Sequence, residues 1–364
     1  MTVSATADVK PIGVRTPLDC CQTPAGADLE NAAKLNEMIG ASWMSQAVYA
    51  AAELRIADLL AQGDQHADTL AAASGCQPTS LLRLLRALAS LGLCLENDDG
   101  SYALTAMGAL LRTDARNSLR SWAIWWGRRQ WSWWGNLAYS VKTGDSARRL
   151  ATGHQGYQHL EMDPEVAALF NQAMVEMSRL VAGEVAGVVV ALAPERVVDV
   201  GGGYGEVLVA VLAAHPTLQA ILFDLPHTLD GARGRIAAAG MAQRCELLSG
   251  SFFDFIPGGG DIYILKSVLH NWDDARCALL LANCHRAMAH CSRLLIVERL
   301  LPARMTGSLA DQAVARADLN MLVGVGGRER QLAEYHSLLT AAGFAVAAEH
   351  ALALGFSVIV ATRR

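Results

Sequence analysis

From about residue 195 onward, predicted strands and helices alternate along the chain, and this alternation constrains the fold more than any other feature. Four apolar segments rich in branched residues predict strands: RVVDV (196–200), LQAILFDLP (218–226), DIYILKSVL (261–269) and SRLLIVERLLP (292–302). Helical segments separate them, so we expect an α/β fold with a mostly parallel sheet covered on both faces. The end of the chain, 338–364, predicts a helix and two strands close in sequence, which suits an antiparallel hairpin at the sheet edge.

A glycine-rich loop, DVGGGYGEV (199–207), follows the first of these strands and precedes a helix. Glycines let the backbone approach a ligand at the carboxyl end of a strand, where open α/β sheets bind ligands. Asp224 ends the next strand, nineteen residues after Gly205, and is well placed to accept hydrogen bonds from a ribose diol. The spacing is GxGxG rather than GxGxxG, and Glu206 would repel a phosphate. A nucleoside without phosphates, such as S-adenosylmethionine, is therefore favoured.

The N-terminal part predicts helices followed by a β-hairpin. Helical periodicity runs from Leu29 to Leu60, and the leucines of PTSLLRLLRALASLG (78–92) repeat at helical spacing. The next segment, 93–105, alternates in polarity on both sides of a DDG turn. This order of elements is that of a winged helix. Because the second helix has only Arg83 and Arg86 on its polar face and the net charge is -5, packing or dimerisation is favoured over DNA binding.

Composition indicates a cytoplasmic protein without a metal site or a membrane segment. The eight cysteines are scattered, and no CxxC pair or Cys/His cluster has metal-binding spacing, so we expect free thiols in a reducing compartment. The first thirty residues lack the basic start and apolar core of a signal peptide. The most apolar region, 181–213, is interrupted by acids, which argues against a membrane span.

Several motifs together resemble the small-molecule O-methyltransferases of the plant caffeate and bacterial polyketide and phenazine type. They cover nearly the whole chain: LLRLLRALASLGL, DGSYALTAMGALLR, FNQAM, VVDVGGGYGEVL, FDLPHTL, GSFFDFIP, LKSVLHNWDD and ADLNMLVGVGGRER. The resemblance implies a Rossmann-like class I methyltransferase domain and an N-terminal winged-helix dimerisation domain. It also implies a homodimer that uses S-adenosylmethionine, releases S-adenosylhomocysteine and methylates a hydroxyl of a small aromatic molecule, as in antibiotic biosynthesis and other secondary metabolism.

With this resemblance the chain divides into four parts. They are a disordered tail (1–28), a winged-helix dimerisation domain (29–115), a helical connector that lines the acceptor pocket (116–180) and an S-adenosylmethionine-binding methyltransferase domain (181–364). The connector contains six of the eight tryptophans, between Trp122 and Trp134. These side chains could line a pocket for a flat ligand or pack between two domains, and both interpretations stay open.

The resemblance assigns roles to residues at matching positions. Residues expected at the cofactor are Gly201 and Gly203 at its methionine part, Asp224 and Leu225 at the ribose and adenine, Ser251 and Phe252 beside the adenine, and Lys266 and Trp272 on its flank. His270 would be the general base, with Glu298 and Glu329 beside it. Phe170, Met174 and Met321 would wall the acceptor pocket. No metal ion is expected.

Three positions depart from the pattern of this family. Ser251 stands where an acid usually binds the adenine amino group, which weakens adenine recognition or shifts it to Asp254 or the backbone. Asn271 follows the base, where aspartate is common. Gly324 replaces an asparagine of the plant enzymes, so we expect an acceptor pocket that differs from theirs.

The chemistry explains why a histidine would serve as the base. A phenol has a pKa of about 10 and a histidine one of about 6.5, so at neutral pH His270 is expected to be largely unprotonated and able to accept the proton. An acid on the far ring nitrogen would fix the tautomer and stabilise the imidazolium. Glu298, at the end of the strand LLIVE, is expected at the same sheet edge as His270.

Three alternatives stay open besides methyl transfer. An enzyme with the same fold and cofactor could carry out a hydroxylation, a decarboxylation or a pericyclic step, although His270, Glu298 and Glu329 favour methyl transfer. A nicotinamide-dependent dehydrogenase is opposed by the glycine spacing. A winged-helix regulator without enzymatic activity would bind duplex DNA with a steep salt dependence.

Overall fold

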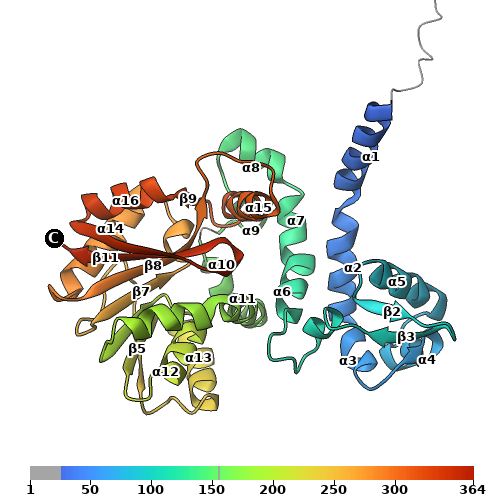
Figure 1. Cartoon of the computed structure of the whole chain (residues 1–364), viewed down its shortest axis with the longest axis horizontal. Helices are drawn as coiled ribbons and strands as arrows, with labels where there is room; N and C mark the ends of the chain where they lie inside the picture. The colour runs from blue at the N-terminus through green and yellow to red at the C-terminus, as the bar shows by residue number, and fades with distance from the viewer. Residues whose placement is uncertain (1–25, 155) are drawn as a thin grey trace, which may run out of the picture. The chain divides into compact units, whose positions relative to one another are not determined.

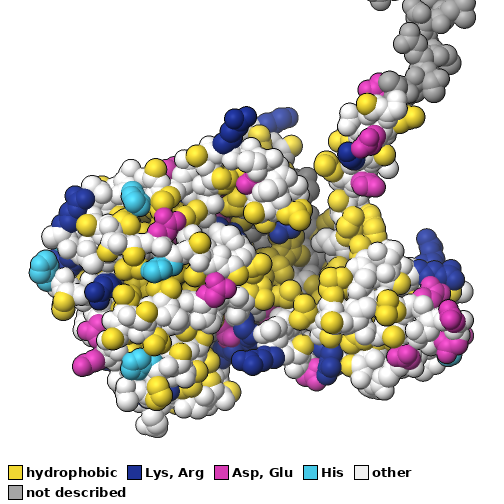
Figure 2. All heavy atoms as spheres, in the orientation of Figure 1, with side chains coloured by type: hydrophobic (Ala, Val, Ile, Leu, Met, Phe, Trp, Pro, Cys, Tyr) yellow, Lys and Arg dark blue, Asp and Glu magenta, His cyan; other side chains and the backbone are white. Residues whose placement is uncertain are grey.

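The computed structural model describes residues 26–154 and 156–364 (Figure 1). The described residues divide into two units, one that ends at Met44 and one that begins at Ser45. The first unit contains helix α1 (Gly26–Gly40) and the start of α2 (Ser42–Glu53). No residue of α1 is buried, and Figure 2 shows apolar side chains along it, which include Leu35, Met38 and Ile39. The tail expected over 1–28 lies outside the described residues, except for its last three, which begin α1.

Helices and a small antiparallel sheet follow in the second unit, as the sequence predicts. The elements are α3 (Ile56–Leu60), β1 (Gln65–His66), α4 (Ala67–Ser74), α5 (Pro78–Ser90), β2 (Cys94–Glu96) and β3 (Ser101–Leu104), with the strands in the order β1-β3-β2. The leucine stripe of α5 is buried in the core between them, at Leu81, Leu85 and Leu88. The predicted hairpin is confirmed, because β2 and β3 pair antiparallel.

The region after this sheet is helical. Its elements are η1 (Gly108–Leu111), α6 (Arg120–Trp125), the π-helical η2 (Trp126–Gln130), α7 (Trp131–Trp134), α8 (Leu137–Thr143), α9 (Ala147–Thr152), α10 (Gln158–Glu161) and α11 (Pro164–Ala191). The side chain of Asp163 caps α11 by accepting from the N–H of Val166, and Pro164 fits the first turn. Because α11 is continuous to Ala191, the boundary expected at residue 180 falls inside a single helix.

The tryptophans of this region build a core of their own. Trp125 and Trp133 are buried with ring centroids 5.7 Å apart, and Trp125 also contacts Phe170 edge to face at 5.1 Å. None of the six tryptophans between 122 and 134 is among the described residues that line the large cavity of the next subsection. Core packing is therefore the interpretation that the structure supports for them.

The sheet of the second half is mostly parallel. Its strands are β4 (Arg196–Val200), β5 (Gln219–Asp224), β6 (Cys245–Ser249), β7 (Ile262–Lys266), β8 (Arg293–Leu301), β9 (Arg330–Gln331), β10 (Phe344–Ala351) and β11 (Phe356–Arg363). The order is β10-β11-β8-β7-β4-β5-β6, with the short β9 paired to β8. Only β10 and β11 run antiparallel to their neighbours, which confirms the hairpin expected at the edge.

Helices cover both faces of this sheet (Figure 1). They are α12 (Glu206–Ala214), α13 (Pro226–Ala238), α14 (Asp274–Ala287), α15 (Leu309–Val323) and α16 (Leu332–Ala341), with short turns η3 (Leu269–Asn271) and η4 (Ala353–Gly355). Successive strand residues enter different cores: Val197 packs with residues of α11, α12 and α13, and Val198 packs with residues of α14 and α16. The apolar strands are thus buried on both faces.

Two strand ends differ from the sequence expectation. The strand expected over 261–269 ends at Lys266, because Ser267 adopts a left-handed backbone with φ 55° and turns the chain into η3. His270 therefore lies in a short helical turn beyond the strand. β8 continues to Leu301, so Glu298 lies inside the strand rather than at its end. No described helix combines the length and hydropathy that a bilayer crossing requires.

Candidate active site

A cavity of about 780 Å³ opens at the carboxyl ends of β4, β5 and β7. All eight residues expected at the cofactor line it, namely Gly201, Gly203, Asp224, Leu225, Ser251, Phe252, Lys266 and Trp272. Phe170 and Met174, both on α11, line it as well. Met321 and His270 are not lining residues, although Val268 and Asn271 on either side of His270 are. The structure thus gathers the expected cofactor residues in one place, beside the turn that carries His270.

The carboxylate of Asp224 accepts hydrogen bonds from the backbone of the glycine loop and of the residue after Asp224. Gly203 has a left-handed φ of 59°, and its N–H donates to Oδ2 of Asp224 at 2.8 Å. The N–H of Leu225 donates to Oδ1 of the same carboxylate at 2.7 Å. Burial raises the pKa of Asp224, while these two backbone donors act in the opposite direction. Asp224 therefore connects the carboxyl ends of β4 and β5 at the cavity wall.

Two ionisable side chains of the cavity, the buried Asp199 and the half-buried Lys266, follow neighbouring strands of the sheet. Asp199 lines the cavity, is buried, and has no hydrogen-bond partner for Oδ2 among the described residues. Burial, together with the charge of Asp224, raises the pKa of Asp199 to about 7. Lys266 donates to Oγ of Ser178 at 2.9 Å, and burial lowers the pKa of its amino group to about 8. Asp199 was not predicted from the sequence as a site residue, although it stands at the start of the glycine motif.

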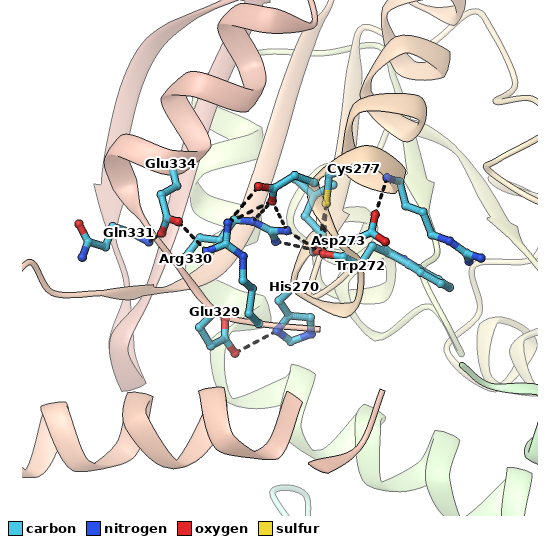
Figure 3. Close-up of polar contacts among 12 residues, drawn as sticks. His270, Trp272, Asp273, Cys277, Glu329, Arg330, Gln331 and Glu334 are labelled. Atoms are coloured by element: carbon cyan, nitrogen blue, oxygen red, sulfur yellow. Dashed lines mark hydrogen bonds and ion pairs between the residues drawn. The ribbon is translucent and has the colours of Figure 1, made fainter. Parts of the chain in front are cut away.

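Nδ1 of His270 contacts two buried carboxylates, those of Glu298 and Glu329, and Figure 3 shows the contact with Glu329. Its Nδ1 is 3.0 Å from Oε1 of Glu329 and 3.4 Å from Oε2 of Glu298. Glu298 is 0% exposed and Glu329 1%. Oε1 of Glu298 also accepts from the backbone N–H groups of Val268, at 3.0 Å, and His270, at 3.3 Å. The three predicted residues therefore meet as expected, and Glu298 binds both the ring and the backbone of the histidine turn.

The two carboxylates change the protonation of His270. Burial by itself lowers the pKa of His270, but the charges of Glu298 and Glu329 outweigh burial and raise the pKa above its ordinary value. Burial also raises the pKa of Glu298. A larger fraction of His270 is thus protonated at neutral pH than of a histidine with the ordinary pKa. The same three side chains have ligand atoms within 4.8 Å of one another, the spacing of a metal site.

The loop before β9 fits closely against the histidine turn. The N–H of Arg328 donates to the carbonyl oxygen of His270 at 2.8 Å. A Cβ atom on Gly327 would lie 2.0 Å from that same oxygen, so only glycine allows this approach. The second glycine of the GGRER motif is therefore explained by the packing of two backbones.

Both the oxygen and the nitrogen of the Asn271 side-chain amide make hydrogen bonds. Its Oδ1 accepts from the hydroxyl of Tyr157 at 2.9 Å, and its Nδ2 donates to the carbonyl oxygen of Ser267 at 3.0 Å. An aspartate could not make the second bond, which gives a physical reason for asparagine here. Burial raises the pKa of Tyr157 to about 12, so its hydroxyl remains a donor. Tyr157 lines the cavity and was missed, because its segment carries no motif.

Ser251 lines the cavity at the place where the sequence pattern leads one to expect an acid. Its Oγ accepts from the N–H of Phe253 at 3.2 Å. Asp254, the acid suggested as a substitute, is not among the described lining residues. The ring of Phe252 packs edge to face on that of Phe253, with centroids 4.8 Å apart, so this wall offers an aromatic surface rather than a charge.

Comparison with known proteins places the chain among methyltransferases. A family model described as an O-methyltransferase domain matches residues 134–345, and one described as an O-methyltransferase dimerisation domain matches residues 36–114. The phenazine O-methyltransferase of Lysobacter antibioticus is 37% identical over 327 residues, which are 90% of this chain and 95% of that protein. The 3-amino-4-hydroxybenzoate 4-O-methyltransferase of Streptomyces cremeus is 37% identical over 333 residues, covering 91% and 90%.

Solved structures agree with these matches. An O-methyltransferase from neocarzinostatin biosynthesis, crystallised with S-adenosylmethionine and 2-hydroxy-5-methyl naphthoic acid, superposes with a TM-score of 0.73. It is 34% identical and covers 88% of this chain, which in turn covers 96% of that chain.

Proposed function

The chain belongs to the O-methyltransferase family and has the class I methyltransferase fold with an N-terminal dimerisation domain, and we propose that it methylates a hydroxyl group of a small aromatic secondary metabolite, with His270 as the general base. The observation that carries the proposal is the contact of His270 Nδ1 with Glu329, 3.0 Å apart, in a turn whose neighbouring residues line the cavity. That contact leaves the other ring nitrogen, Nε2, available to an acceptor.

The residues around the cavity fit S-adenosylmethionine. The carboxylate oxygen of Asp199 that has no partner among the described residues and the half-buried ammonium of Lys266 suit the amino and carboxylate groups of a methionine part. Asp224 would accept from the ribose hydroxyls, and Leu225 and Phe252 would enclose the adenine. Gly201 and Gly203 would leave room for close approach of the ligand to the loop, with Ser251 and Trp272 completing the wall. The bound cofactor supplies a methyl group already activated by its sulfonium, so the transfer itself requires no metal ion.

The residues of this chain would provide orientation and proton transfer. The acceptor oxygen must lie in line with the methyl carbon and the sulfur, which favours a rigid pocket. Nε2 of His270 accepts the proton of the acceptor hydroxyl as the new bond forms. Glu329 holds Nδ1–H, and both carboxylates stabilise the imidazolium that results. The raised pKa of His270 matches this role, because it strengthens the base.

The cavity wall suggests a flat acceptor. Phe170 and Tyr157 line it with ring centroids 5.6 Å apart, and Met174 adds a polarisable thioether. Met321 stays a proposed wall residue on α15, outside the residues that line the cavity here. Two of the relatives are named for hydroxylated aromatic acids, 3-amino-4-hydroxybenzoate and 2,7-dihydroxy-5-methyl-1-naphthoate. We propose an acceptor of this class.

The proposal extends to assembly and compartment. We propose a homodimer formed through the winged-helix domain at 29–115, joined by the connector at 116–180 to the cofactor-binding domain at 181–364, in line with the dimerisation match. A cytoplasmic location agrees with the described cysteines, all of which are free thiols. A net charge of -5 gives no support to a nucleic-acid partner.

The first experiment is a calorimetric titration with S-adenosylmethionine and S-adenosylhomocysteine, followed by mass spectrometry of 3-amino-4-hydroxybenzoate and related phenols after incubation. A methylated product with the wild type and its loss in His270→Ala, at unchanged cofactor affinity, is the expected result. Cofactor binding without methylation of any phenol would favour the alternative of a non-methylating reaction. A fully active His270→Ala variant would exclude His270 as the base.

A further inference from the structure

Arg330 is a fully buried arginine that binds the backbone on both sides of His270. Its side chain is 0% exposed. Nη1 donates to the carbonyl oxygen of Leu269 at 3.1 Å, and Nη2 donates to that of Trp272 at 2.7 Å. Nε and Nη2 also donate to Oδ1 of Asp274, at 3.1 and 2.8 Å (Figure 3). One guanidinium group therefore fixes three points of the segment that runs through the histidine turn into α14.

Other groups hold the same turn at its N–H groups and at the carbonyl oxygen of His270. Glu298 accepts from the N–H groups of Val268 and His270, and the N–H of Arg328 donates to the carbonyl oxygen of His270. Arg330 supplies charged donors to the carbonyl groups before and after. Hydrogen bonds to charged groups are stronger than those between neutral groups, so the turn is held more firmly than its own short helix could achieve.

Glu329 and Arg330 act on the same residue from consecutive positions. Side chains of consecutive residues in an extended chain point to opposite sides. Glu329 contacts the imidazole ring of His270, whereas Arg330 contacts the backbone that carries this ring. Arg330 also pairs with Leu300 of β8, the strand that contains Glu298. Arg330 is thus bonded to the backbone that carries the ring and paired with the strand that carries one of the two carboxylates.

We propose that Arg330 is a positioning residue for methyl transfer, which holds the histidine turn so that Nδ1 of His270 stays in contact with Glu329 and Nε2 faces the acceptor. The inference rests on the proposed function of His270 as the base. The planar guanidinium fork reaches two carbonyl oxygens and a carboxylate at once, whereas a lysine ammonium is a point charge that cannot. Arg330→Lys therefore keeps the charge and removes the fork.

Arg244→Lys is a matched control for this substitution. Arg244 also donates to three backbone carbonyl oxygens, those of Leu212, His215 and Leu218, but its partners are remote from the histidine turn in the fold, before and at the start of β5. Each variant replaces a guanidinium group that donates hydrogen bonds to several backbone carbonyl oxygens. Only Arg330→Lys is expected to alter the environment of His270.

The main measurement is an NMR titration of His270 in isotope-labelled protein saturated with S-adenosylhomocysteine, with the signal assigned by its absence in His270→Gln. Glu298 and Glu329 raise the pKa of His270, while burial and the charge of Lys266 lower it. Arg330→Lys is expected to lower the pKa of His270 toward the ordinary value of about 6.5, because the ring moves away from the carboxylates. With 3-amino-4-hydroxybenzoate as probe acceptor, kcat should fall about 10- to 100-fold with little change in KM.

Two results would overturn the inference. One is an unchanged pKa of His270 in Arg330→Lys, and the other is a decrease that Arg244→Lys reproduces at equal loss of melting temperature. If Arg330→Lys fails to fold, Asp274→Asn serves instead, because it removes the charge of the exposed acidic partner that Arg330 shares with Arg328 and should shift the pKa of His270 in the same direction by less. Since the titration needs no turnover, an inactive wild type would count against the proposed function and leave this test intact.

Discussion

Tyr157 donates its hydroxyl hydrogen to Oδ1 of Asn271, 2.9 Å away, and this bond ties the segment between α9 and α11 to the turn that carries His270. Asn271 in turn donates to the carbonyl oxygen of Ser267, the left-handed residue at which the turn begins. Asn271, the residue after the proposed base, therefore connects Tyr157 in the cavity wall to Ser267, where the turn begins. Its amide supplies both an acceptor and a donor, which a carboxylate cannot do.

Asn271→Asp is expected to destabilise the protein and to move the pH dependence of methyl transfer. The new carboxylate would face the carbonyl oxygen of Ser267 without a donor, at a cost of about 1–3 kcal/mol in the free energy of unfolding. A negative charge next to His270 would raise its pKa further. Denaturant unfolding and a pH–rate profile measure the two effects. Tyr157→Phe is the matched control, since it removes one hydrogen bond at a cost of about 1 kcal/mol and adds no charge; equal profiles for both variants would contradict the charge argument.

The rate of methyl transfer should rise with pH through the pKa of His270. Only the neutral imidazole can accept a proton, so kcat/KM falls as the pH drops below this pKa, which the two carboxylates place above about 6.5. Glu329→Gln removes one of these charges, so it should lower the pKa of His270, shift the acidic limb to lower pH and reduce the maximal rate by about 100-fold. A rate that is independent of pH between about 5 and 8 would exclude histidine as the base.

Glu334→Gln provides the control for the Glu329 variant. Glu334 lies in the same part of the chain and pairs with the exposed Arg328, and the glutamine can keep the capping bond to the N–H of Gln331. The substitution removes one negative charge that does not contact His270. Its pH profile should match that of the wild type.

Much of the fold follows from the sequence because its signals are local. Strand residues such as Val197 and Val198 are apolar on both faces, which marks a buried parallel strand whatever its partners are. The glycine loop and Asp224 could be placed because each follows a strand and the carboxyl ends of parallel strands share an edge. The family resemblance then brought together His270, Glu298 and Glu329, three residues from distant segments.

The details of the site depend on contacts that local patterns do not record. The left-handed conformation of Ser267 moves His270 off the strand, and nothing in SVLHN marks it, since serine is not a residue that favours this conformation. Arg330 looks like a surface charge in the sequence but is buried against backbone carbonyl groups that lie 61 and 58 residues earlier in the chain. Tyr157 stands in a segment without periodicity, and only the folded chain brings it to Asn271.

Paired substitutions on α1 should separate the subunits of the proposed homodimer. Met38 and Ile39 are 71% and 73% exposed, which is unusual for adjacent large apolar side chains and typical of an interface. Met38→Asp combined with Ile39→Asp would place two charges in that interface, so light scattering should give the mass of a monomer. Leu279→Asp, at an exposed position of α14, is the control and should remain dimeric. A dimer that persists in the α1 variant would place the interface elsewhere.

Asp199→Asn is expected to stabilise the cofactor-free protein at neutral pH and to weaken cofactor binding. Burial and the charge of Asp224 raise the pKa of Asp199 to about 7, above its unfolded value of 3.8. The folded state therefore holds this proton more tightly, and stability is lost as the pH rises from the unfolded pKa through the folded one. The neutral amide of an asparagine avoids that loss of stability, which for such a pKa shift is on the order of a few kcal/mol.

The pH dependence distinguishes this electrostatic effect from a change in packing. Denaturant unfolding of the cofactor-free protein should show a gain for Asp199→Asn at about pH 8 that falls to less than half at about pH 5, where Asp199 is protonated in the folded state and the pH is only about one unit above the unfolded pKa. Calorimetric titration with S-adenosylmethionine should show a weaker affinity, because the amide carries no charge for the amino group of the ligand. The same gain in stability at both pH values would mean that packing is responsible, and an unchanged affinity would remove Asp199 from the proposed cofactor site.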